Sequence, residues 1–389
     1  MTTYLSGRSN SYDRPTASYS PDEPEHVLTA VDTEAIVLAG VHRRGGGAFE
    51  RVRGPLMRIG QRPMIEFGLD WLLDGGLDRA VICANSSTAA VRDRLGASFR
   101  GELELAYFED ITPRGPAGCL GSAVRLSAAQ TFVVVEASAL PRGVDVRELL
   151  ERHRRSGAAA TVVVGVDRRR RGPNGEHPRM PTGIYVFERE VLERIPAAGY
   201  QDIKEGLLER MYRAGEKVAV HEISGLVPRV LDYQSFVAVS RWVIERAVAE
   251  PSLDPEYVRT GETLRHRTAT VESGAEFMGP VVLGPCAHVS AGAVVIGPTT
   301  IGAGTIVGAG AVVSRSVVWD RCDVARDAVV DRCLLGDDAR VDAGESLTST
   351  LRLSDGPRAL PVSVRVMTPV VPALRFVGRT VTQLVPALS

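Results

Sequence analysis

The stretch GAEFMGPVVLGPCAHVSAGAVVIGPTTIGAGTIVGAGAVVS (residues 274–314) decides the fold of the second half of the chain, because a large apolar residue returns at every sixth position. The same period extends to both sides, with a one-residue slip before residue 318 and another before residue 335. The repeating residues are Val271, Phe277, Leu283, Val289, Val295, Ile301, Val307, Val313, Val318, Val324, Val330, Leu335, Val341 and Leu347. An α-helix repeats about every 3.6 residues and a β-strand about every 2, so neither gives this period.

A period of six is typical of a solenoid of hexapeptide strands with three flat faces in each coil. The large residue fills the interior of such a coil, and a small residue two positions earlier fits its corner. The small residues are Ala275, Ala287, Ala293, Thr299, Thr305, Ala311, Ser316, Cys322, Ala328, Cys333 and Ala339. We therefore predict a left-handed parallel β-helix over residues 265–350.

Residues 33–250 follow another pattern, in which short β-branched runs alternate with helical patterns. The predicted strands are 35–40, 79–85, 102–108, 132–137 and 160–166, and the predicted helices are 63–76, 87–96 and 144–157. This alternation indicates right-handed βαβ units, and hence a Rossmann-like α/β domain with a mixed, mostly parallel sheet. Ligands of such sheets bind beyond the carboxyl ends of the strands, so functional residues are expected in the segments that follow them.

The two ends of the chain differ from both domains. Residues 1–32 are rich in Ser, Thr, Tyr, Pro and Asp, which predicts a disordered leader, with a tyrosine recognition element as the alternative. In the tail, residues 351–389, Leu374, Val377, Val381 and Leu384 share one helical face. We predict a helix that caps the open end of the β-helix. A cationic amphipathic helix that contacts a membrane or a partner is the alternative.

Composition excludes several classes of protein. With 46 Lys and Arg against 47 Asp and Glu, the net charge of −1 argues against a general nucleic-acid binder. The five cysteines are scattered without a C-x-x-C pair, which predicts neither a disulfide framework nor a zinc site and favours the reducing cytoplasm. The sequence contains no run of 18 or more apolar residues and no signal-peptide pattern at its start, so we expect neither a membrane span nor secretion.

Several local stretches together resemble the sugar-1-phosphate nucleotidylyltransferases, particularly the mannose-1-phosphate guanylyltransferase type with a C-terminal hexapeptide-repeat domain. They are AIVLAG (35–40), GPLMRIGQRPMIEFGLDWLLDGG (54–76), GPAGCLGSA (115–123), FVVVEASALPRGVDVRELLERHR (132–154) and TGIYVFEREVLERIP (182–196). The resemblance covers about residues 34–350. It implies a nucleotidyltransferase domain from a family that couples a sugar-1-phosphate to an NTP, releases pyrophosphate and holds Mg²⁺ with two aspartates.

The phosphate-binding loop of that family is G-x-G-T-R, and this chain departs from it. The loop reads GVHRRGGG (40–47), in which Gly40 and Arg44 match while His42 and Arg43 stand where glycine and threonine belong. Glycine lets the backbone approach phosphate without an intervening Cβ, which histidine does not. The glycines at 45–47 leave two readings open, a looser anion-binding nest or a plain flexible loop.

The family's two lysines are also replaced. Gly54 stands at the position of the lysine in the family's P-K-P stretch. Arg53 or Arg58 could supply the positive charge instead, but a guanidinium fork is not equivalent to an ammonium. The stretch with the family's E-K-P lysine is reduced to RRRRGPNGEHPRMP (168–181), so the sugar-phosphate clamp is missing. The arginines at 168–171 are read as a solvated turn, with anion binding as the alternative.

Both metal aspartates are replaced as well. Ser138 stands at the first position, two residues after Glu136, and the second maps near Arg229, three residues before Asp232. A serine hydroxyl is a weak neutral ligand for Mg²⁺, and a cation repels the ion. We therefore predict no catalytic residues, no metal ligands and no cofactor, with Mg²⁺ expected only if the enzyme is active after all.

One binding element matches the family. GPAG (115–118) resembles the loop that lies against the nucleobase, where small residues permit close backbone hydrogen bonding. The predicted nucleotide-binding residues are therefore Gly115, Ala117 and Gly118, together with Gly40 and Arg44.

These departures favour a catalytically degenerate member of the family, because the loss of one electrostatic contact to the transition state typically costs about 10²–10³ in rate. The predicted role is a nucleotide- or nucleotide-sugar-binding regulatory or scaffold subunit in nucleotide-sugar or polysaccharide biosynthesis. Its predicted assembly is a homo-oligomer, or a hetero-oligomer with an active relative, through the β-helix.

Two alternatives remain. An active nucleotidylyltransferase would use a rewired site of His42, Arg43, Arg44, Glu136 and Asp232. An acyltransferase, a chemistry that hexapeptide β-helices also carry, would need His288 as its base, although the hexads around His288 run without the protruding loop such sites usually have.

Overall fold

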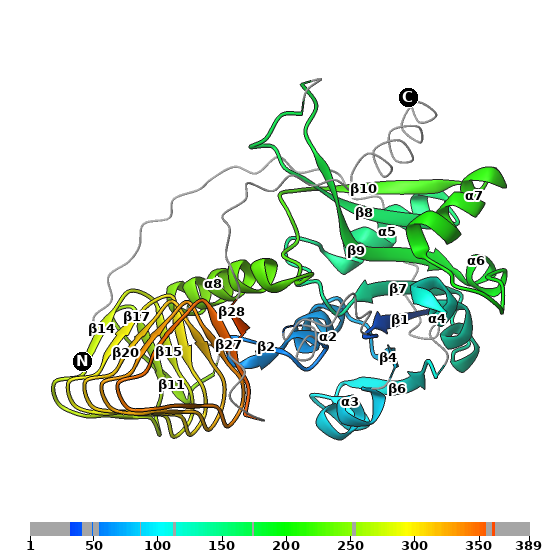
Figure 1. The fold of residues 1–389 in the computed structure, drawn as a ribbon. Coiled ribbons are helices and arrows are strands. Elements are labelled where there is room, and N and C mark those ends of the chain that lie inside the picture. The colour runs from blue at the N-terminus through cyan, green and yellow to red at the C-terminus, as the bar shows by residue number, and fades with distance from the viewer. Residues whose placement is uncertain are drawn as a thin grey trace, which may run out of the picture.

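A computed structural model shows an α/β domain joined to a β-helix, with a long helix running along their junction (Figure 1). The structure describes residues 32–40, 49, 54–85, 87–111, 114–172, 175–250 and 254–354, and the backbone of residues 360–361. The predicted leader up to residue 31 and the predicted helix of the tail lie outside these residues.

The α/β domain is built on a sheet with the strand order β10-β8-β9-β7-β1-β4-β6-β5. Its strands are β1 (Thr33–Leu38), β4 (Arg79–Ala84), β5 (Ser98–Phe99), β6 (Leu103–Glu109), β7 (Thr131–Glu136), β8 (Ala160–Val166), β9 (Arg179–Glu188) and β10 (Val218–Ser224). Strand β9 runs antiparallel to β7 and β8, and β5 runs antiparallel to β6, whereas the other pairs are parallel. The predicted mixed, mostly parallel sheet is confirmed.

Helices cover both faces of this sheet. One face is covered by α2 (Met64–Asp74), α3 (Thr88–Leu95) and α5 (Val146–Ser156), and the other by α4 (Gly115–Ala123), α6 (Arg189–Glu193), the π-helical turn η2 (Ile203–Leu208) and α7 (Glu209–Arg213). Alternate residues of β7 show why: Val133 and Val135 pack toward the first set, while Phe132 and Val134 pack toward the second. A strand buried on both faces needs apolar residues at every position, which is why its sequence is a continuous apolar run.

The second domain is a parallel β-helix with three faces. The first face contains β12 (Thr263–His266), β15 (Val281–Leu283), β18 (Thr299–Ile301), β21 (Val317–Val318), β24 (Leu334–Leu335) and β27 (Thr350–Arg352). The second contains β13 (Thr270–Val271), β16 (His288–Val289), β19 (Ile306–Val307), β22 (Asp323–Val324) and β25 (Arg340–Val341). The third contains β14 (Glu276–Met278), β17 (Val294–Ile296), β20 (Val312–Ser314), β23 (Val329–Asp331) and β26 (Ser346–Thr348).

The coils change length where the sequence period slips. Val281 pairs with Thr299, eighteen residues later, whereas Val317 pairs with Leu334, seventeen residues later. In the longer coil three residues separate Ile296 of β17 from Thr300 of β18, whereas in the next coil two residues separate their partners, Ser314 and Val317. The shorter corner carries Arg315, whose φ of 47° lies in the left-handed region. The residues with the six-residue period fill the interior, as predicted, and Val289, Val295 and Val307 are fully buried there.

The ends of the first face are paired by short strands. Strand β11 (Tyr257–Thr260) forms an antiparallel hairpin with β12, and β28 (Leu360–Pro361) pairs antiparallel with β27. The sequence pattern predicts neither strand, because neither continues the hexad. Both lie beside strands that would otherwise present unpaired backbone groups at the edge of a sheet.

Helix α8 (Tyr233–Ala249) joins the two domains and packs on the first face of the β-helix. Ile244 and Val248 of α8 contact Leu264 and Val282 of that face. Nearer the start of α8, Phe236 belongs to an apolar cluster that also contains residues of both domains: Phe49, Met57, Ile59, Met64, Leu140, Val230, Val239, Val317, Trp319, Leu334 and Leu351. The two domains therefore share a buried junction.

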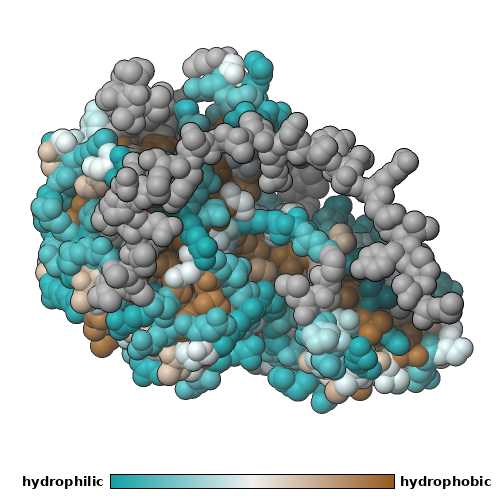
Figure 2. Space-filling view, turned by 180° about the vertical axis from the view of Figure 1, so that it is seen from behind, coloured by the Kyte–Doolittle hydropathy of each residue, from teal (hydrophilic) through white to brown (hydrophobic). Residues whose placement is uncertain are grey.

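The surface in Figure 2 is mainly hydrophilic, with several separate apolar patches. Within the described residues, the structure contains no helix that is both long and apolar enough to span a membrane. All five cysteines are free, and only Cys286 is exposed.

Candidate functional site

The carboxyl edge of the α/β sheet carries the candidate site. Strand β1 lies in the middle of the sheet, with β4 on one side and β7 on the other. The direction in which the chain adds strands to the sheet therefore reverses at β1. Gly40 follows β1, Asn85 follows β4, and Ser138 follows β7, with Glu136 as the last residue of β7. A parallel sheet binds its ligands where the direction of winding reverses, outside the carboxyl ends of its strands.

An ion pair occupies the end of β7. The Arg229 guanidinium donates through Nη2 to the Glu136 carboxylate and lies 3.5 Å from Ser138 Oγ, while Nη1 donates to the Pro181 carbonyl oxygen at 3.3 Å. The Tyr185 hydroxyl donates to Glu136 Oε1 at 3.4 Å. Glu136 therefore has its charge neutralised and both carboxylate oxygens engaged.

The backbone fixes Arg229 beside β7. Arg229 forms an antiparallel bridge with Ala139, and the Val230 amide donates to the Ser138 carbonyl oxygen at 2.8 Å. Gly183 of β9 leaves room for the pair: it has φ of 80°, and a Cβ there would lie 3.1 Å from Glu136 Cδ and 3.2 Å from Arg229 Cζ. Any other residue at position 183 would be strained and would crowd the ion pair.

These residues do not fit Mg²⁺. Ser138 and Arg229 lie together, as their predicted places in the motifs imply, so a neutral hydroxyl and a cation stand where two carboxylates would bind the ion. Magnesium prefers oxygen ligands with negative charge. Among the residues that the structure describes, no three His, Cys, Asp or Glu side chains are grouped so that they could hold a metal ion.

Asp232 has a different role from the one that the active alternative gives it. Its side chain caps α8: Oδ1 accepts the Ser235 amide at 2.8 Å, and the Ser235 hydroxyl lies 2.8 Å from the Asp232 amide. Glu136 is engaged separately by Arg229. In this structure the two carboxylates named in the active alternative, Glu136 and Asp232, therefore each have a separate partner, and that alternative stays a prediction.

Replacing Asp232 with alanine is expected to lower the free energy of unfolding by about 1 kcal/mol, the usual contribution of an N-cap. Asp232→Asn is the matched control, because its amide oxygen still accepts the Ser235 amide hydrogen. Urea denaturation followed by circular dichroism measures both variants. Equal stability of Asp232→Ala and the unmodified protein would contradict the capping role.

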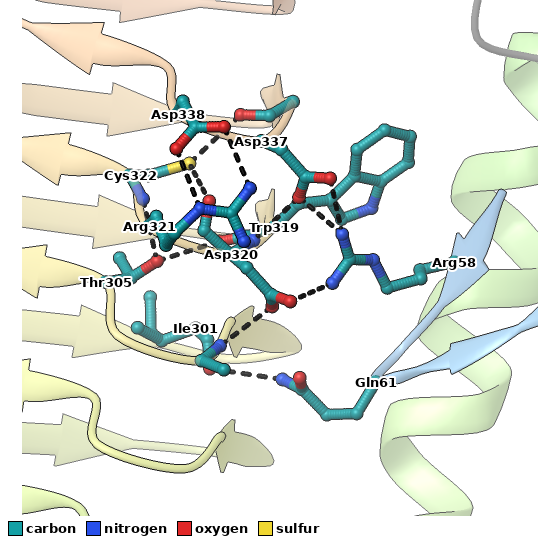
Figure 3. Close-up of polar contacts among 12 residues, drawn as sticks. Arg58, Gln61, Ile301, Thr305, Trp319, Asp320, Arg321, Cys322, Asp337 and Asp338 are labelled. Atoms are coloured by element: carbon teal, nitrogen blue, oxygen red, sulfur yellow. Dashed lines mark hydrogen bonds and ion pairs between the residues drawn. The ribbon is translucent and has the colours of Figure 1, made fainter. Parts of the chain in front are cut away.

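Arg58 is not available as a replacement for the loop lysine. It lies in β2 (Arg58–Ile59), which pairs with β3 (Arg62–Pro63), and its guanidinium forms ion pairs with Asp320 and Asp337 of the β-helix (Figure 3). The Trp319 ring lies beside it, with Arg58 Cζ 5.8 Å from the ring centroid. Arg58 therefore joins the two domains, and the prediction that it supplies charge to phosphates is wrong. Arg53, the other cation considered for that position, lies outside the described residues.

The predicted nucleotide-binding residues are placed as follows. Gly40 is exposed after β1, and Arg44, with His42 and Arg43, lies outside the described residues. The GPAG stretch is the first turn of α4 instead of a loop.

Gly115, Ala117 and Gly118 lie together in that turn. The Ala117 amide donates to the Gln201 carbonyl oxygen at 3.0 Å, and a Cβ on Gly115 would lie 2.5 Å from the same oxygen. The α4 N-terminus thus lies against the chain just before η2. A nucleotide-binding role for these residues stays a prediction.

Sequence reasoning missed Lys204, in the turn η2. The Asp202 side chain accepts the amide hydrogens of Lys204 at 2.7 Å and Glu205 at 3.0 Å, which fixes the start of the turn. Burial lowers the pKa of the Lys204 ammonium, opposed by the Glu136 charge and reinforced by that of Arg229. Only two of the 389 residues are lysine, Lys204 and Lys217, in a chain otherwise made basic by arginine, and this rarity is the one signal that could have drawn attention to it.

Two other candidates lie apart from this group. Residues 168–170 and Arg171 are exposed in a turn after β8, in which the Arg169 amide donates to Asp167 Oδ1 at 3.1 Å. His288 is half-buried on the second face of the β-helix, where Nε2 lies 2.9 Å from Glu272 Oε1. The structure thus places His288 on the outside of the solenoid, paired with a carboxylate.

Comparison with known proteins supports the resemblance in both domains. A nucleotidyl transferase family model matches residues 50–174, and a model described as the GMPPB C-terminal domain matches residues 277–358. The UTP–glucose-1-phosphate uridylyltransferase of Synechocystis sp. is 27% identical over 289 residues, 64% of this chain and 73% of that protein. The mannose-1-phosphate guanylyltransferase of Mycobacterium tuberculosis is 26% identical over 285 residues, 66% of this chain and 76% of that protein.

A solved structure from Bacillus anthracis, described as a glucose-1-phosphate thymidylyltransferase in complex with a sucrose, is 19% identical with a TM-score of 0.45, and the match covers 54% of this chain and 94% of that one. The matches to both domains and to the two curated relatives agree with the motifs in the sequence. These matches support the sugar-1-phosphate nucleotidylyltransferase family, which both domains of this chain resemble.

Proposed function

We propose that this chain binds a nucleotide or nucleotide sugar without catalysing nucleotidyl transfer, and acts in the cytoplasm as a regulatory or scaffold subunit of nucleotide-sugar or polysaccharide biosynthesis. The observation that carries the proposal is the ion pair between Glu136 and Arg229 beside Ser138. It stands at the place where the resemblance implies two magnesium-binding carboxylates.

Physical chemistry supports the loss of catalysis. Transfer between an NTP and a sugar phosphate brings two polyanions together, and the site must neutralise charge as it moves to the pyrophosphate. Here Glu136 is neutralised by Arg229, Arg58 is held by the β-helix, and the family's E-K-P lysine is missing from residues 168–181. Each lost contact typically lowers the rate by about 10²–10³, so their combined loss leaves no useful turnover.

The β-helix supports the scaffold role. Its first face is covered by α8 and by the β2–β3 hairpin, whereas apolar side chains are exposed on its second and third faces. Ile306 lies on the second face, and Met278 and Val329 lie on the third. Extended, flat solenoid faces with exposed apolar residues suit side-by-side association with another copy or with an active relative.

The test measures pyrophosphate release and ligand binding in parallel. The purified protein is incubated with Mg²⁺, a panel of NTPs and a panel of sugar-1-phosphates, and the Mycobacterium tuberculosis mannose-1-phosphate guanylyltransferase serves as the positive control. We expect no pyrophosphate above the protein-free reaction, together with measurable binding of a nucleotide or nucleotide sugar by calorimetry.

Magnesium-dependent pyrophosphate release that is lost in Glu136→Gln would overturn the proposal. Purification with native partners tests the assembly, since a stoichiometric complex with an active family member supports the scaffold role. A chain that binds no nucleotide and stays monomeric in the presence of such a relative would contradict it.

A further inference from the structure

We propose that a basic arm between β8 and β9, made of residues 167–172 and 175–178, binds the anionic surface of a membrane. Its charge comes from the four consecutive arginines at 168–171. The inference goes beyond the proposed function, which assigns no role to this segment and needs no membrane. It takes the anion-binding alternative for these arginines and names the anion as a surface of lipid phosphates.

Backbone hydrogen bonds give the basic arm a defined shape. The Asp167 amide donates to the Pro178 carbonyl oxygen at 3.1 Å, which extends the pairing of β8 with β9 beyond the ends of both strands. Further along the arm, the Gly172 amide donates to the Glu176 carbonyl oxygen at 2.7 Å. The two sides of the arm are therefore held together, and the connection between β8 and β9 stands out from the α/β domain (Figure 1).

The four arginine side chains at 168–171 are exposed and unpaired. With the other residues that the structure describes, none of their guanidinium groups makes a hydrogen bond or an ion pair. By contrast, Arg179 at the base of the arm is balanced by Glu222, with Nε 2.6 Å from Oε1. Asp167 and Glu176 are the acidic residues of the arm, so the four arginines leave it with an excess of positive charge.

This local charge is unusual for the chain and unfavourable for the arm by itself. The whole chain has a net charge of −1, so the excess is concentrated at this one place. Like charges held in one turn repel each other, and protein surfaces usually intersperse both signs. A surface of negative charge relieves the repulsion and attracts the arm from a distance.

An exposed leucine beside the arm favours a membrane over other polyanions. Leu226 is 51% exposed and follows Gly225, which forms an antiparallel bridge with Val166 at the end of β8. An apolar side chain next to a cationic cluster suits the boundary between lipid headgroups and acyl chains. Single-stranded nucleic acid is instead bound by cations together with aromatic side chains, and the arm contains no Phe, Tyr or Trp.

Lipid phosphates provide the acceptors that the arm lacks. A guanidinium group donates two parallel hydrogen bonds to a phosphate, and charge-assisted bonds of this kind are the strong ones. The cytoplasmic face of a membrane is negatively charged and attracts clusters of four or more arginines or lysines. Each such residue near the surface strengthens binding about five-fold, and salt screens the attraction.

The first experiment is cosedimentation of the full chain with lipid vesicles. One set of vesicles is phosphatidylcholine alone, and the other contains about one third phosphatidylglycerol, each at about 0.1 M and about 0.5 M NaCl. We expect binding to the anionic vesicles at the lower salt concentration, a large loss of that binding at the higher one, and no binding to the neutral vesicles. Equal sedimentation with both sets would overturn the inference.

Two variants with the same change in net charge give a matched comparison. The arm variant combines Arg168→Gln, Arg169→Gln, Arg170→Gln and Arg171→Gln, and its affinity for anionic vesicles is expected to fall about 100-fold or more. The control variant replaces four exposed arginines that are scattered over both domains and is expected to keep most of the affinity. It combines Arg125→Gln, Arg265→Gln, Arg326→Gln and Arg340→Gln. Circular dichroism confirms that both variants are folded.

A variant of Leu226 separates a membrane from other anionic partners. Leu226→Ser is expected to weaken binding to anionic vesicles about five-fold or more, because an apolar contact with the acyl region is lost. The dependence of binding on salt concentration is expected to stay the same, since no charge is removed. Unchanged vesicle affinity in Leu226→Ser would overturn the choice of a membrane as the partner.

Two soluble polyanions test the other occupants of the arm. Fluorescence anisotropy with labelled polyglutamate and with a labelled DNA duplex is measured at the lower salt concentration. Binding of either probe by a chain that does not sediment with anionic vesicles would overturn the inference, as would equal vesicle binding by the arm variant and the unmodified protein. Neither result affects the proposed function, whose test of nucleotide binding and pyrophosphate release contains no lipid.

Discussion

Replacing Phe236 with alanine is expected to lower the free energy of unfolding by about 3–5 kcal/mol, the usual effect of deleting a buried aromatic side chain. Phe236 is 0% exposed in α8, and its ring centroid lies 5.6 Å from that of Phe49. It packs in a cluster to which the α/β domain contributes Ile59 and the β-helix contributes Trp319. The cavity would therefore open at the junction of the two domains, where neither domain can close it alone.

The neighbouring residue provides the control for this variant. Val237 is 41% exposed on the same helix, so Val237→Ala is expected to change the stability by less than about 0.5 kcal/mol. Urea denaturation followed by tryptophan fluorescence measures both, since Trp319 of the β-helix lies within the cluster. Similar unfolding midpoints for the two variants would show that the domains do not stabilise each other through Phe236.

Replacing Arg58 with alanine is expected to lower the free energy of unfolding by about 2–4 kcal/mol. The Arg58 and Asp320 side chains are both 20% exposed, and Asp337 is 38% exposed, so the group is partly screened by solvent. Removing one partner of a buried ion pair costs about 3–5 kcal/mol, and this exposure reduces the effect. Two adjacent carboxylates would be left without their cation at the domain junction.

Two control variants test whether the loss in Arg58→Ala comes from its ion pairs at the domain junction or would follow from removing any arginine. Arg321→Ala removes the exposed ion pair with Asp338 and is expected to leave the stability almost unchanged, because solvent screens this pair. Arg58→Met combined with Asp320→Asn and Asp337→Asn removes the unpaired charges and should recover part of the stability. Denaturation midpoints measure all of them, and a loss in Arg58→Ala no larger than in Arg321→Ala would refute the anchoring role.

The sequence predicts the β-helix well because each coil contacts only its neighbours. The interior position of Val295 follows from a local repeat, and so does the slip that leaves seventeen residues between Val317 and Leu334. The parallel core of the α/β domain is predictable for a related reason, since strands buried on both faces are continuous apolar runs. Both signals arise from residues close together in the chain.

The rest depends on contacts between distant residues. Nothing near Arg58 in the sequence indicates that Asp320 and Asp337, more than 250 positions away, will bind it. GPAG is predicted as a loop from the resemblance alone, whereas in the structure it begins helix α4 and the segment before η2 packs against it. The motif comparison maps the second metal position near Arg229, but the ion pair of Arg229 with Glu136 becomes visible only when the strands are assembled.

Helix α8 and the α/β domain contact the solenoid on several successive coils, from Leu264 of β12 to Leu351 of β27. The end of α8 contacts β15 and β18, whereas Arg58 binds Asp320 and Asp337 on later coils. Successive coils are about 4.8 Å apart, so duplication or deletion of one whole repeat within the contacted coils would displace the later contacts by that amount, although the solenoid alone would tolerate the change. Evolution can therefore lengthen or shorten this repeat array freely only beyond the coils that touch the α/β domain.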